Sequence, residues 1–197
     1  MKKKVIGITV GIGCGKSAVM SLLEEKYQGA VLLTDQIGHD LMEPGGKNYE
    51  GIVAHFGTDF LDETKHIDRK KLGNLVFQDP EKLEQLNQLT HPNILKETKR
   101  RIEQLKANPD VSMVCLESAL LLDTPLCEFC DEIWFIYADQ DTRVARLMEG
   151  RNYTREYCLT VMEKQLSEKH FLEKADFVID NSGSLEQTEE QLKKIIR

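Results

Sequence analysis

Three glycines, a lysine and a serine lie close together near the start of the chain, in the sequence Gly-Ile-Gly-Cys-Gly-Lys-Ser at 11–17. Glycine lets backbone N–H groups converge on an anion, because no Cβ atoms collide there. Lys16 can reach the β- and γ-phosphates of a nucleotide, and the Ser17 hydroxyl can ligate Mg²⁺. The spacing therefore predicts a phosphate-binding loop. The predicted nucleotide-binding residues of this loop are Gly11, Ile12, Gly13, Cys14, Gly15, Lys16, Ser17 and Ala18.

The segments on either side of the loop are suited to hold it in place. The apolar run Val5–Val10 predicts a buried strand, and the amphipathic stretch Ser17–Lys26 predicts a helix that Gly29 ends. The helix N-terminus carries unpaired N–H donors and partial positive charge, so it attracts phosphate. The strict pattern G-x-x-x-x-G-K-[ST] requires glycine where this chain has Val10. We interpret Val10 as one more strand residue; the alternative is an ordinary glycine-rich turn.

Apolar runs that alternate with helical patterns predict an α/β fold of three layers, with a mostly parallel five-stranded sheet. The runs are Val5–Val10, Ala30–Leu33, Val111–Leu116, Ile133–Ala138 and Phe177–Asp180. We expect a single domain over residues 1–197, with its core at about 1–43, 108–146 and 175–197. The other segments are a helical insertion at about 44–107 and a lid with its flanking helix at about 147–174.

Carboxylates follow two of these strands, at the edge of the sheet where α/β proteins bind their ligands. Asp35 follows the second run and can act as general base for an acceptor hydroxyl, or cap a helix predicted over Gln36–Met42. Its position alone does not separate these two roles. Glu117 follows the third run and is predicted to hold Mg²⁺ near the phosphates, with a local loop cap as the alternative.

The inserted segment carries too much helical pattern for one crossover between strands. Asp68 is expected to cap a helix over Arg69–Phe77, and a helix over Pro80–Leu89 is expected to precede another that starts at His91-Pro92 and reaches about Leu105. We interpret the insertion as a subdomain that holds an acceptor substrate. Its lysines and arginines are expected to form mainly a solvated face, with one or two facing a phosphate.

Arginines gather between the fourth and fifth predicted strands. Helices are expected over Asp141–Met148 and about Arg155–His170, with a polar break at 150–155. Arginine forks match phosphate oxygens and offset charge that develops during phosphoryl transfer, as a lid over a triphosphate requires. The alternative is a set of solvent-facing arginines that pair with nearby glutamates. The arginines concerned are Arg146, Arg151 and Arg155.

The composition is that of a soluble globular chain, since 41% of its 197 residues are hydrophobic and 30% are charged. The formal net charge of −7 argues against a general nucleic-acid or anionic-membrane surface. No apolar run approaches the ~18 residues that span a bilayer. The five cysteines show no disulfide framework, and Cys127-x-x-Cys130 lacks two further zinc ligands nearby. We therefore expect a cytoplasmic protein with no evident obligate protein partner.

Beyond the loop, blocks of sequence in a fixed order resemble the dephospho-coenzyme A (dephospho-CoA) kinase family nearly end to end. The blocks are Gly-Ile-Gly-Cys-Gly-Lys-Ser at 11–17, Thr-Asp-Gln-Ile at 34–37, Glu-Pro-Gly at 43–45, His-Phe-Gly at 55–57, Ile-Asp-Arg at 67–69, Val-Phe-Gln-Asp-Pro-Glu at 76–81, His-Pro-Asn-Ile at 91–94 and Ala-Asp-Phe-Val-Ile-Asp-Asn-Ser-Gly at 175–183. Phosphate loops are widespread, so the later blocks make the resemblance specific.

The resemblance implies a P-loop kinase fold and transfer of the γ-phosphate of ATP, with Mg²⁺, to the 3′-hydroxyl of the dephospho-CoA ribose. It favours Asp35 as the base rather than as a cap. It also implies that Lys16, Arg146 and Arg151 offset phosphoryl charge.

The resemblance further implies binding roles outside the loop. Asn181 and Gly183 would lie beside the adenine of ATP. The helices of 44–107 would hold the pantetheine-bearing substrate, and a lid around 150–156 would exclude water.

Several residues depart from the family pattern. This chain has Val10 where the family usually has glycine, Cys14 where it has serine, Ala18 where it has threonine and Leu33 where it has aspartate. It also has Glu117-Ser-Ala-Leu-Leu-Leu-Asp123 where the family has Asp-x-Pro-Leu-Leu-x-Glu. We therefore expect an active but weak or divergent kinase. The rival hypotheses are a kinase of another nucleoside or small alcohol and a non-catalytic nucleotide-binding module. We also expect the pKa of the Cys14 thiol to be lowered near the helix start.

Overall fold

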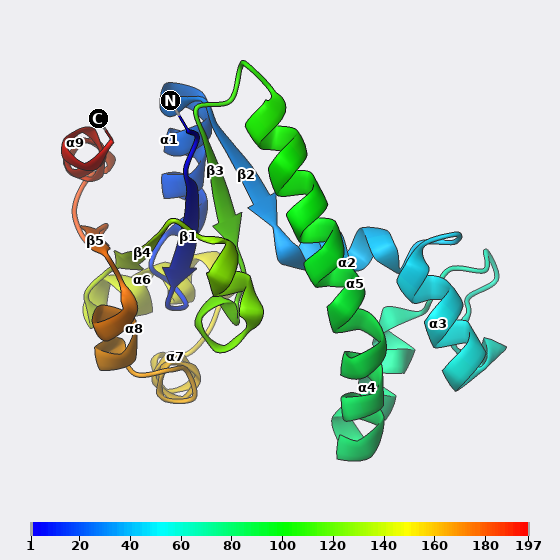
Figure 1. The fold of residues 1–197 in the computed structure, drawn as a ribbon. Coiled ribbons are helices and arrows are strands. Elements are labelled where there is room, and N and C mark those ends of the chain that lie inside the picture. The colour runs from blue at the N-terminus through cyan, green and yellow to red at the C-terminus, as the bar shows by residue number, and fades with distance from the viewer. Residues whose placement is uncertain (1, 197) are drawn as a thin grey trace. The chain divides into compact units, whose positions relative to one another are not determined.

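The computed structural model describes residues 2–196 and contains a five-stranded sheet, with helices packed against it (Figure 1). Its strands are β1 (Val5–Val10), β2 (Gly29–Leu33), β3 (Met113–Glu117), β4 (Glu132–Tyr137) and β5 (Phe177–Asp180). The strand order is β2-β3-β1-β4-β5; β1 pairs in parallel with β3 and β4, and β4 pairs in parallel with β5. The predicted α/β fold is confirmed. Met1 and Arg197, which the predicted range 1–197 includes, lie outside the described residues.

The chain divides into two compact units. The first comprises Met1–Leu32 and Gln104–Arg197, and the second comprises Leu33–Glu103. All five strands except the last residue of β2 therefore belong to the first unit. Within the described residues, no helix combines the length and apolar character that crossing a membrane requires.

Successive residues of β1 face opposite sides of the sheet, and each side is covered by different helices. Ile6 and Ile8 belong to a core cluster with residues of α1 (Lys16–Tyr27) and α9 (Leu185–Ile195). Gly7 points to the opposite face, since successive strand residues alternate. A Cβ on Gly7 would lie 2.7 Å from Cys130 Sγ and 2.9 Å from Leu121, so the short helices η2 (Leu121–Asp123) and η3 (Pro125–Phe129) cover that face closely.

The first helix ends differently from the prediction. Gln28, not Gly29, adopts the left-handed conformation that terminates α1, and Gly29 begins β2. A Cβ on Gly29 would lie 3.0 Å from the Leu23 carbonyl oxygen. Glycine is therefore needed there for close packing of helix and strand.

The segment after β4 forms three helices: α6 (Gln140–Arg151), α7 (Arg155–Glu163) and α8 (Glu168–Lys174). The predicted single helix Arg155–His170 is wrong, because Ser167 accepts a hydrogen bond from the His170 N–H and starts α8. This start directs Phe171 onto Phe135 of β4, with ring centroids 4.9 Å apart. The predicted polar break is also shorter, since Asn152 ends α6 in the left-handed conformation.

The second unit is helical. Its helices are α2 (Thr34–Leu41), α3 (Lys47–Phe56), η1 (Thr58–Phe60), α4 (Arg69–Gln78) and most of α5 (Pro80–Ala107). The Asp68 side chain accepts a hydrogen bond from the Lys71 N–H, which confirms the predicted cap of α4. A single antiparallel bridge, Leu61 to Ile67, closes the loop before that cap.

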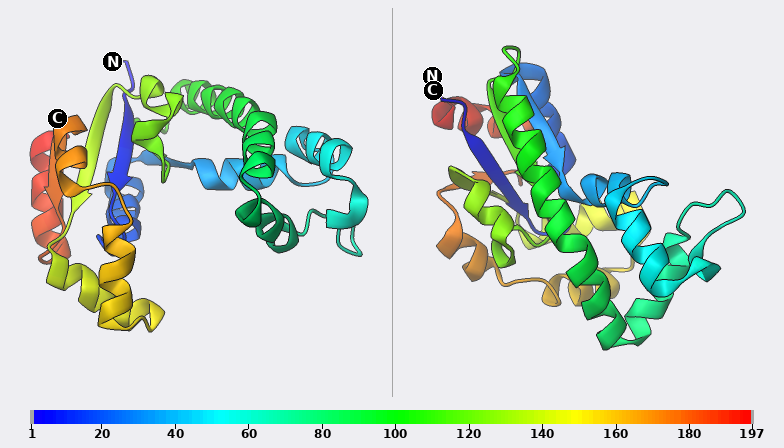
Figure 2. Two further views of the ribbon diagram at one scale, coloured as in Figure 1. Left: turned by 90° about the horizontal axis from the view of Figure 1, so that it is seen from below. Right: turned by 45° about the vertical axis from the view of Figure 1, so that its right-hand side comes forward.

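The helix break predicted at His91-Pro92 is wrong, because α5 runs continuously through Pro92. Proline removes an N–H donor and crowds the preceding turn, which bends a helix without always ending it. The bend of α5 is visible in Figure 2. Asn93 donates from its side-chain amide to the Leu89 carbonyl, 3.2 Å away, and so provides a donor in this turn.

Candidate active site

A cavity of about 590 Å³ opens in the first unit, at the carboxyl end of β1. It is lined by Val10, Gly11, Ile12, Gly13, Cys14, Gly15, Lys16, Ser17, Glu117, Ser118, Ala119, Arg146, Leu147, Gly150, Arg151 and Gln165. Val10 is the last residue of β1, in agreement with its interpretation as a strand extension. The loop predicted to bind phosphate thus surrounds an open space large enough for a phosphate chain. Ala18, an exposed residue of α1, is not in the lining.

Two glycines of the loop have left-handed backbones and close neighbours. Gly13 has φ 81° and Gly15 has φ 82°, a region that favours glycine. A Cβ on Gly13 would lie 2.9 Å from the Arg143 carbonyl oxygen, and one on Gly15 would lie 2.4 Å from Asn181 Nδ2. Gly15 also precedes α1 without a side-chain cap, so the first N–H groups of that helix are available to an anion.

Lys16 and Glu117 form an ion pair within the cavity wall. Lys16 Nζ lies 2.6 Å from Glu117 Oε1, and only 6% of the Glu117 side chain is exposed. Glu117 ends β3 opposite Ile8 of β1, so the parallel register brings this carboxylate to the start of the loop. A buried carboxylate requires a partner, and Lys16 supplies it. The alternative role of Glu117 as a local cap has no hydrogen bond to support it among the described residues.

Arg146 and Asn181 form hydrogen bonds that stabilise the loop. Arg146 donates to the Asn181 carbonyl at 2.8 Å and to the Cys14 carbonyl at 3.3 Å. Asn181 Nδ2 donates to the same Cys14 carbonyl at 2.8 Å, and Thr188 Oγ1 donates to Asn181 Oδ1 at 2.8 Å. Asn181 and Thr188 are both buried, so this network is shielded from water.

The side chain of Asn181 is therefore committed to the loop rather than free to read a base. Gly183 is exposed, and a Cβ on it would lie 2.0 Å from Gln187 Oε1. Neither Asn181 nor Gly183 lines the cavity. Their proximity to adenine stays a prediction.

The remaining lid arginines differ from each other. Arg151 is the last residue of α6 and lines the cavity. Arg155 is exposed, as in the solvent-facing alternative, but its partner is Asp141 rather than a glutamate; it donates to Asp141 Oδ1 at 3.1 Å.

Sequence reasoning missed two residues that contact the loop. Arg143 donates from Nε to the Ile12 carbonyl at 2.8 Å, and Gln165 accepts at Oε1 from the Ile12 N–H at 2.8 Å. Arg143 could have been found, because it precedes Arg146 by three residues and shares its helix face. Gln165 could not, since its position in a break between helices depends on where α8 starts.

The prediction of a low pKa for Cys14 is wrong. Burial raises the pKa of the Cys14 thiol, and the nearby Arg143 charge only partly opposes this effect. The Cys14 side chain points into the core cluster, whereas its carbonyl accepts the hydrogen bonds described above. The residue therefore contributes packing and a carbonyl acceptor to the loop rather than a reactive thiolate.

Asp35 lies in the second unit, in the first turn of α2. Leu33 occupies the N-cap position, and no side chain caps this helix, so Asp35 is not the cap that the sequence allowed. The Asp35 side chain is exposed. Its carboxylate is consequently not consumed by a capping bond.

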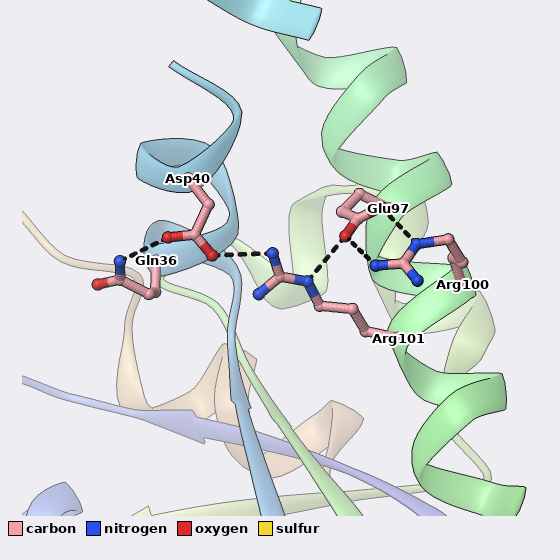
Figure 3. Close-up of polar contacts among 5 residues, drawn as sticks. All are labelled: Gln36, Asp40, Glu97, Arg100 and Arg101. Carbon is pink, nitrogen blue, oxygen red and sulfur yellow. Dashed lines mark hydrogen bonds and ion pairs between the residues drawn. The ribbon is translucent and has the colours of Figure 1, made fainter. Parts of the chain in front are cut away.

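Polar contacts fasten α2 to α5 within the second unit (Figure 3). Asp40 accepts from Gln36 Nε2 at 2.8 Å and from Arg101 at 2.8 Å, and Arg101 also donates to Glu97 Oε1 at 2.9 Å. Glu97 accepts a bidentate bond from Arg100, at 2.7 and 2.6 Å. Hydrogen bonds from Arg100, and then Arg101, lower the pKa of Glu97 to about 2. The network holds one end of the helix whose other end carries Asp35.

The parallel sheet, the glycine loop before α1 and the lysine–glutamate pair are features of a P-loop nucleotide-binding protein. Comparison with known proteins identifies the family. The sequence model of the dephospho-CoA kinase family matches residues 4–187. The dephospho-CoA kinases of Carboxydothermus hydrogenoformans and Oceanobacillus iheyensis are 37% and 36% identical to this chain, over 98% of its length and 93% and 96% of theirs. The chain belongs to the dephospho-CoA kinase family.

Solved structures share the fold of this chain. A protein from Thermus thermophilus superposes with a TM-score of 0.80 at 30% identity, covering 100% of this chain and 97% of its own. The dephospho-CoA kinase of Campylobacter jejuni superposes with a TM-score of 0.72 at 24% identity, covering 98% and 97%, and supports the fold. A shikimate kinase from Acinetobacter baumannii, 14% identical, shares the fold with a TM-score of 0.53.

Proposed function

We propose that this protein transfers the γ-phosphate of ATP to the 3′-hydroxyl of dephospho-CoA, which yields ADP and CoA in the last step of CoA synthesis. The observation that carries the proposal is the family match over residues 4–187, which includes a phosphate loop that keeps Gly13, Gly15, Lys16 and Ser17. In the transfer, the acceptor oxygen forms a bond to the γ-phosphorus, the bond from that phosphorus to the ADP oxygen breaks, and the hydroxyl proton moves to a base.

The phosphate chain of ATP binds along residues 11–18 in this proposal. Backbone N–H groups at the start of α1 and the Lys16 ammonium face the phosphate oxygens. Arg146 and Arg151 add positive charge at the cavity wall, where it offsets the charge of the transferred group. Arg146 is suited to this role because two main-chain carbonyls already fix its guanidinium.

Mg²⁺ is the cofactor that the proposed reaction implies. The residues fit it, because the exposed Ser17 hydroxyl and the buried Glu117 carboxylate are oxygen donors on the wall of one cavity. Ser17 and Glu117 would hold the ion, which would supply charge neutralisation to the phosphates. Lys16 balances the Glu117 charge, and Mg²⁺ held by Glu117 would leave Lys16 for the phosphates.

Asp35 is the proposed base. Its carboxylate is exposed and caps no helix, so it is available to take the proton of the acceptor hydroxyl. The helices of about 44–107 are proposed to bind the pantetheine arm of the acceptor, and the lid of about 147–174 to exclude water from the γ-phosphate. The turn at Asn181 and Gly183 is proposed to contact adenine through main-chain atoms.

An acceptor assay tests the proposal. Pure protein is incubated with Mg-ATP and dephospho-CoA, adenosine or pantetheine in turn, and products are identified by mass spectrometry. We expect ADP and CoA in equal amounts with dephospho-CoA only. ADP formation with another alcohol would instead indicate a kinase of different specificity. Tight ATP binding without turnover of any acceptor would indicate a nucleotide-binding module.

A further inference from the structure

Gln165 lies in the link between α7 and α8, at the boundary of two cavities. It lines the phosphate cavity and also a second cavity of about 270 Å³, which Phe135, Phe171 and Arg143 line as well. The link is not helical, so its main chain places the Gln165 side chain against the loop rather than along a helix surface.

The Gln165 amide closes a triangle of hydrogen bonds around Ile12. Its Oε1 accepts from the Ile12 N–H at 2.8 Å and from Arg143 at 3.2 Å. Arg143 Nε donates in turn to the Ile12 carbonyl at 2.8 Å. Both main-chain groups of Ile12 are thereby engaged by side chains from outside the loop.

The triangle acts on the first part of the loop, whereas Arg146 and Asn181 contact the loop at Cys14. Ile12 lies between the end of β1 and Gly13, whose positive φ turns the chain toward α1. The Ile12 side chain packs against the cluster of Val144, Leu147 and Cys158. Its N–H would lack this partner without Gln165, and a part-buried N–H without a partner costs free energy.

We propose that Gln165 is a positioning residue for the phosphate loop. Its amide oxygen fixes the Ile12 N–H and the Arg143 guanidinium together, and so keeps the loop in the shape that binds the phosphates. Because the link belongs to the segment proposed as a lid, Gln165 also ties that segment to the loop. The kinetic part of this inference rests on the proposed function; the loop-ordering part does not.

Two substitutions separate this role from general packing. Gln165→Met keeps the length of the side chain and removes the acceptor. Gln165→Glu keeps acceptor oxygens toward Ile12 and Arg143. Lys164→Ala, at an exposed neighbour in the same link, is the matched control. The measurements are amide exchange at Ile12 by NMR on nitrogen-15-labelled protein, ATP affinity by calorimetry, kcat and KM with dephospho-CoA, and Tm.

We expect Gln165→Met to raise Ile12 amide exchange and the ATP Kd by about tenfold, the equivalent of one hydrogen bond. KM for ATP should rise more than kcat falls, while Gln165→Glu keeps the amide protected and Lys164→Ala matches the wild type. Unchanged Ile12 exchange in Gln165→Met would overturn the proposal. Faster exchange with unchanged ATP affinity would overturn it too, because the contact would then be structural only.

The design distinguishes this proposal from the proposed function. Exchange and ATP binding are measured without an acceptor, so they stand even if dephospho-CoA proves not to be phosphorylated. Should Gln165→Met fail to fold, Gln165→Asn shortens the same amide by one methylene and tests the same contact. Normal Ile12 protection and normal ATP affinity in Gln165→Asn would then reject the proposal.

Discussion

At the scale of the residue, the site depends on a few close contacts that other amino acids could not make at the same positions. Gly13 and Gly15 combine left-handed backbones with neighbours closer than a Cβ allows. Glu117 is buried, and Lys16 neutralises its charge. The glycines and the lysine could be recognised from the sequence, because residue type and spacing alone indicate a phosphate loop. The close neighbours themselves, Arg143 and Asn181, come from distant parts of the chain and could not be read in the same way.

Gly15→Ala is expected to weaken both folding and ATP binding. The new methyl group would meet Asn181 Nδ2 at 2.4 Å in a backbone region that alanine disfavours. We expect a loss of about 1–3 kcal/mol in the free energy of unfolding, and ATP affinity at least ~10-fold lower, which urea denaturation and calorimetry measure. Gly73→Ala is the control, since nothing lies within 4 Å of its Cβ position in α4. Equal effects of both substitutions would contradict a special role for Gly15.

Lys16→Met is expected to abolish ATP binding, because it removes the positive charge that faces the phosphates. It is also expected to destabilise the fold, because it leaves the Glu117 carboxylate buried without a partner. Breaking a fully buried pair costs about 3–5 kcal/mol, and partial exposure of Lys16 reduces this to about 1–3 kcal/mol. The double variant Lys16→Met/Glu117→Gln should recover the stability without the ATP affinity. Urea denaturation of both proteins checks this. A single variant as stable as the wild type would show that the pair carries no such cost.

At the scale of the element, strands were predicted better than helix boundaries. The five strands occur where apolar runs predicted them, because a buried strand is specified by its own composition. The errors lie in helices: α5 continues through Pro92, and the predicted helix over 155–170 is two helices. Tertiary contacts lie at both places, namely the hydrogen bond from the Asn93 side chain to Asn48 beside Pro92 and the stacking of Phe171 on Phe135.

The network between α2 and α5 makes stability depend on pH. The pKa of Glu97 is about 2 in the folded protein, against 4.5 ordinarily. Because this pKa is lowered, the stabilisation of the fold by ionised Glu97 is fully present above pH 4.5 and is lost as pH falls toward 2. We expect the free energy of unfolding to fall by about 1–2 kcal/mol in this pH range, a modest value because Arg100 is half exposed. Urea denaturation at several pH values measures it, and Glu97→Gln should show a smaller change. An equal acid sensitivity of Glu97→Gln would assign the effect to other carboxylates.

At the scale of the whole molecule, the two compact units divide the proposed chemistry between them. The first unit carries the phosphate loop, Glu117, Arg146 and Arg151, whereas the second carries Asp35. The fold could be predicted because its strands are recognisable apolar runs. The positions of the loop and of the two carboxylates could be predicted because each of them lies at the end of such a strand. It did not allow prediction of Gln165, whose role depends on the fold around it.

The central claim is that the loop and Asp35 together transfer the γ-phosphate of ATP to the dephospho-CoA 3′-hydroxyl. The most direct test is single-turnover transfer from γ-labelled Mg-ATP, prebound to the wild type and to Asp35→Asn, with dephospho-CoA added by rapid mixing. We predict labelled CoA from the wild type, a rate lower by about 10² or more in Asp35→Asn, and similar ATP Kd in both. Wild-type transfer rates in Asp35→Asn, or label that never reaches dephospho-CoA, would contradict the account.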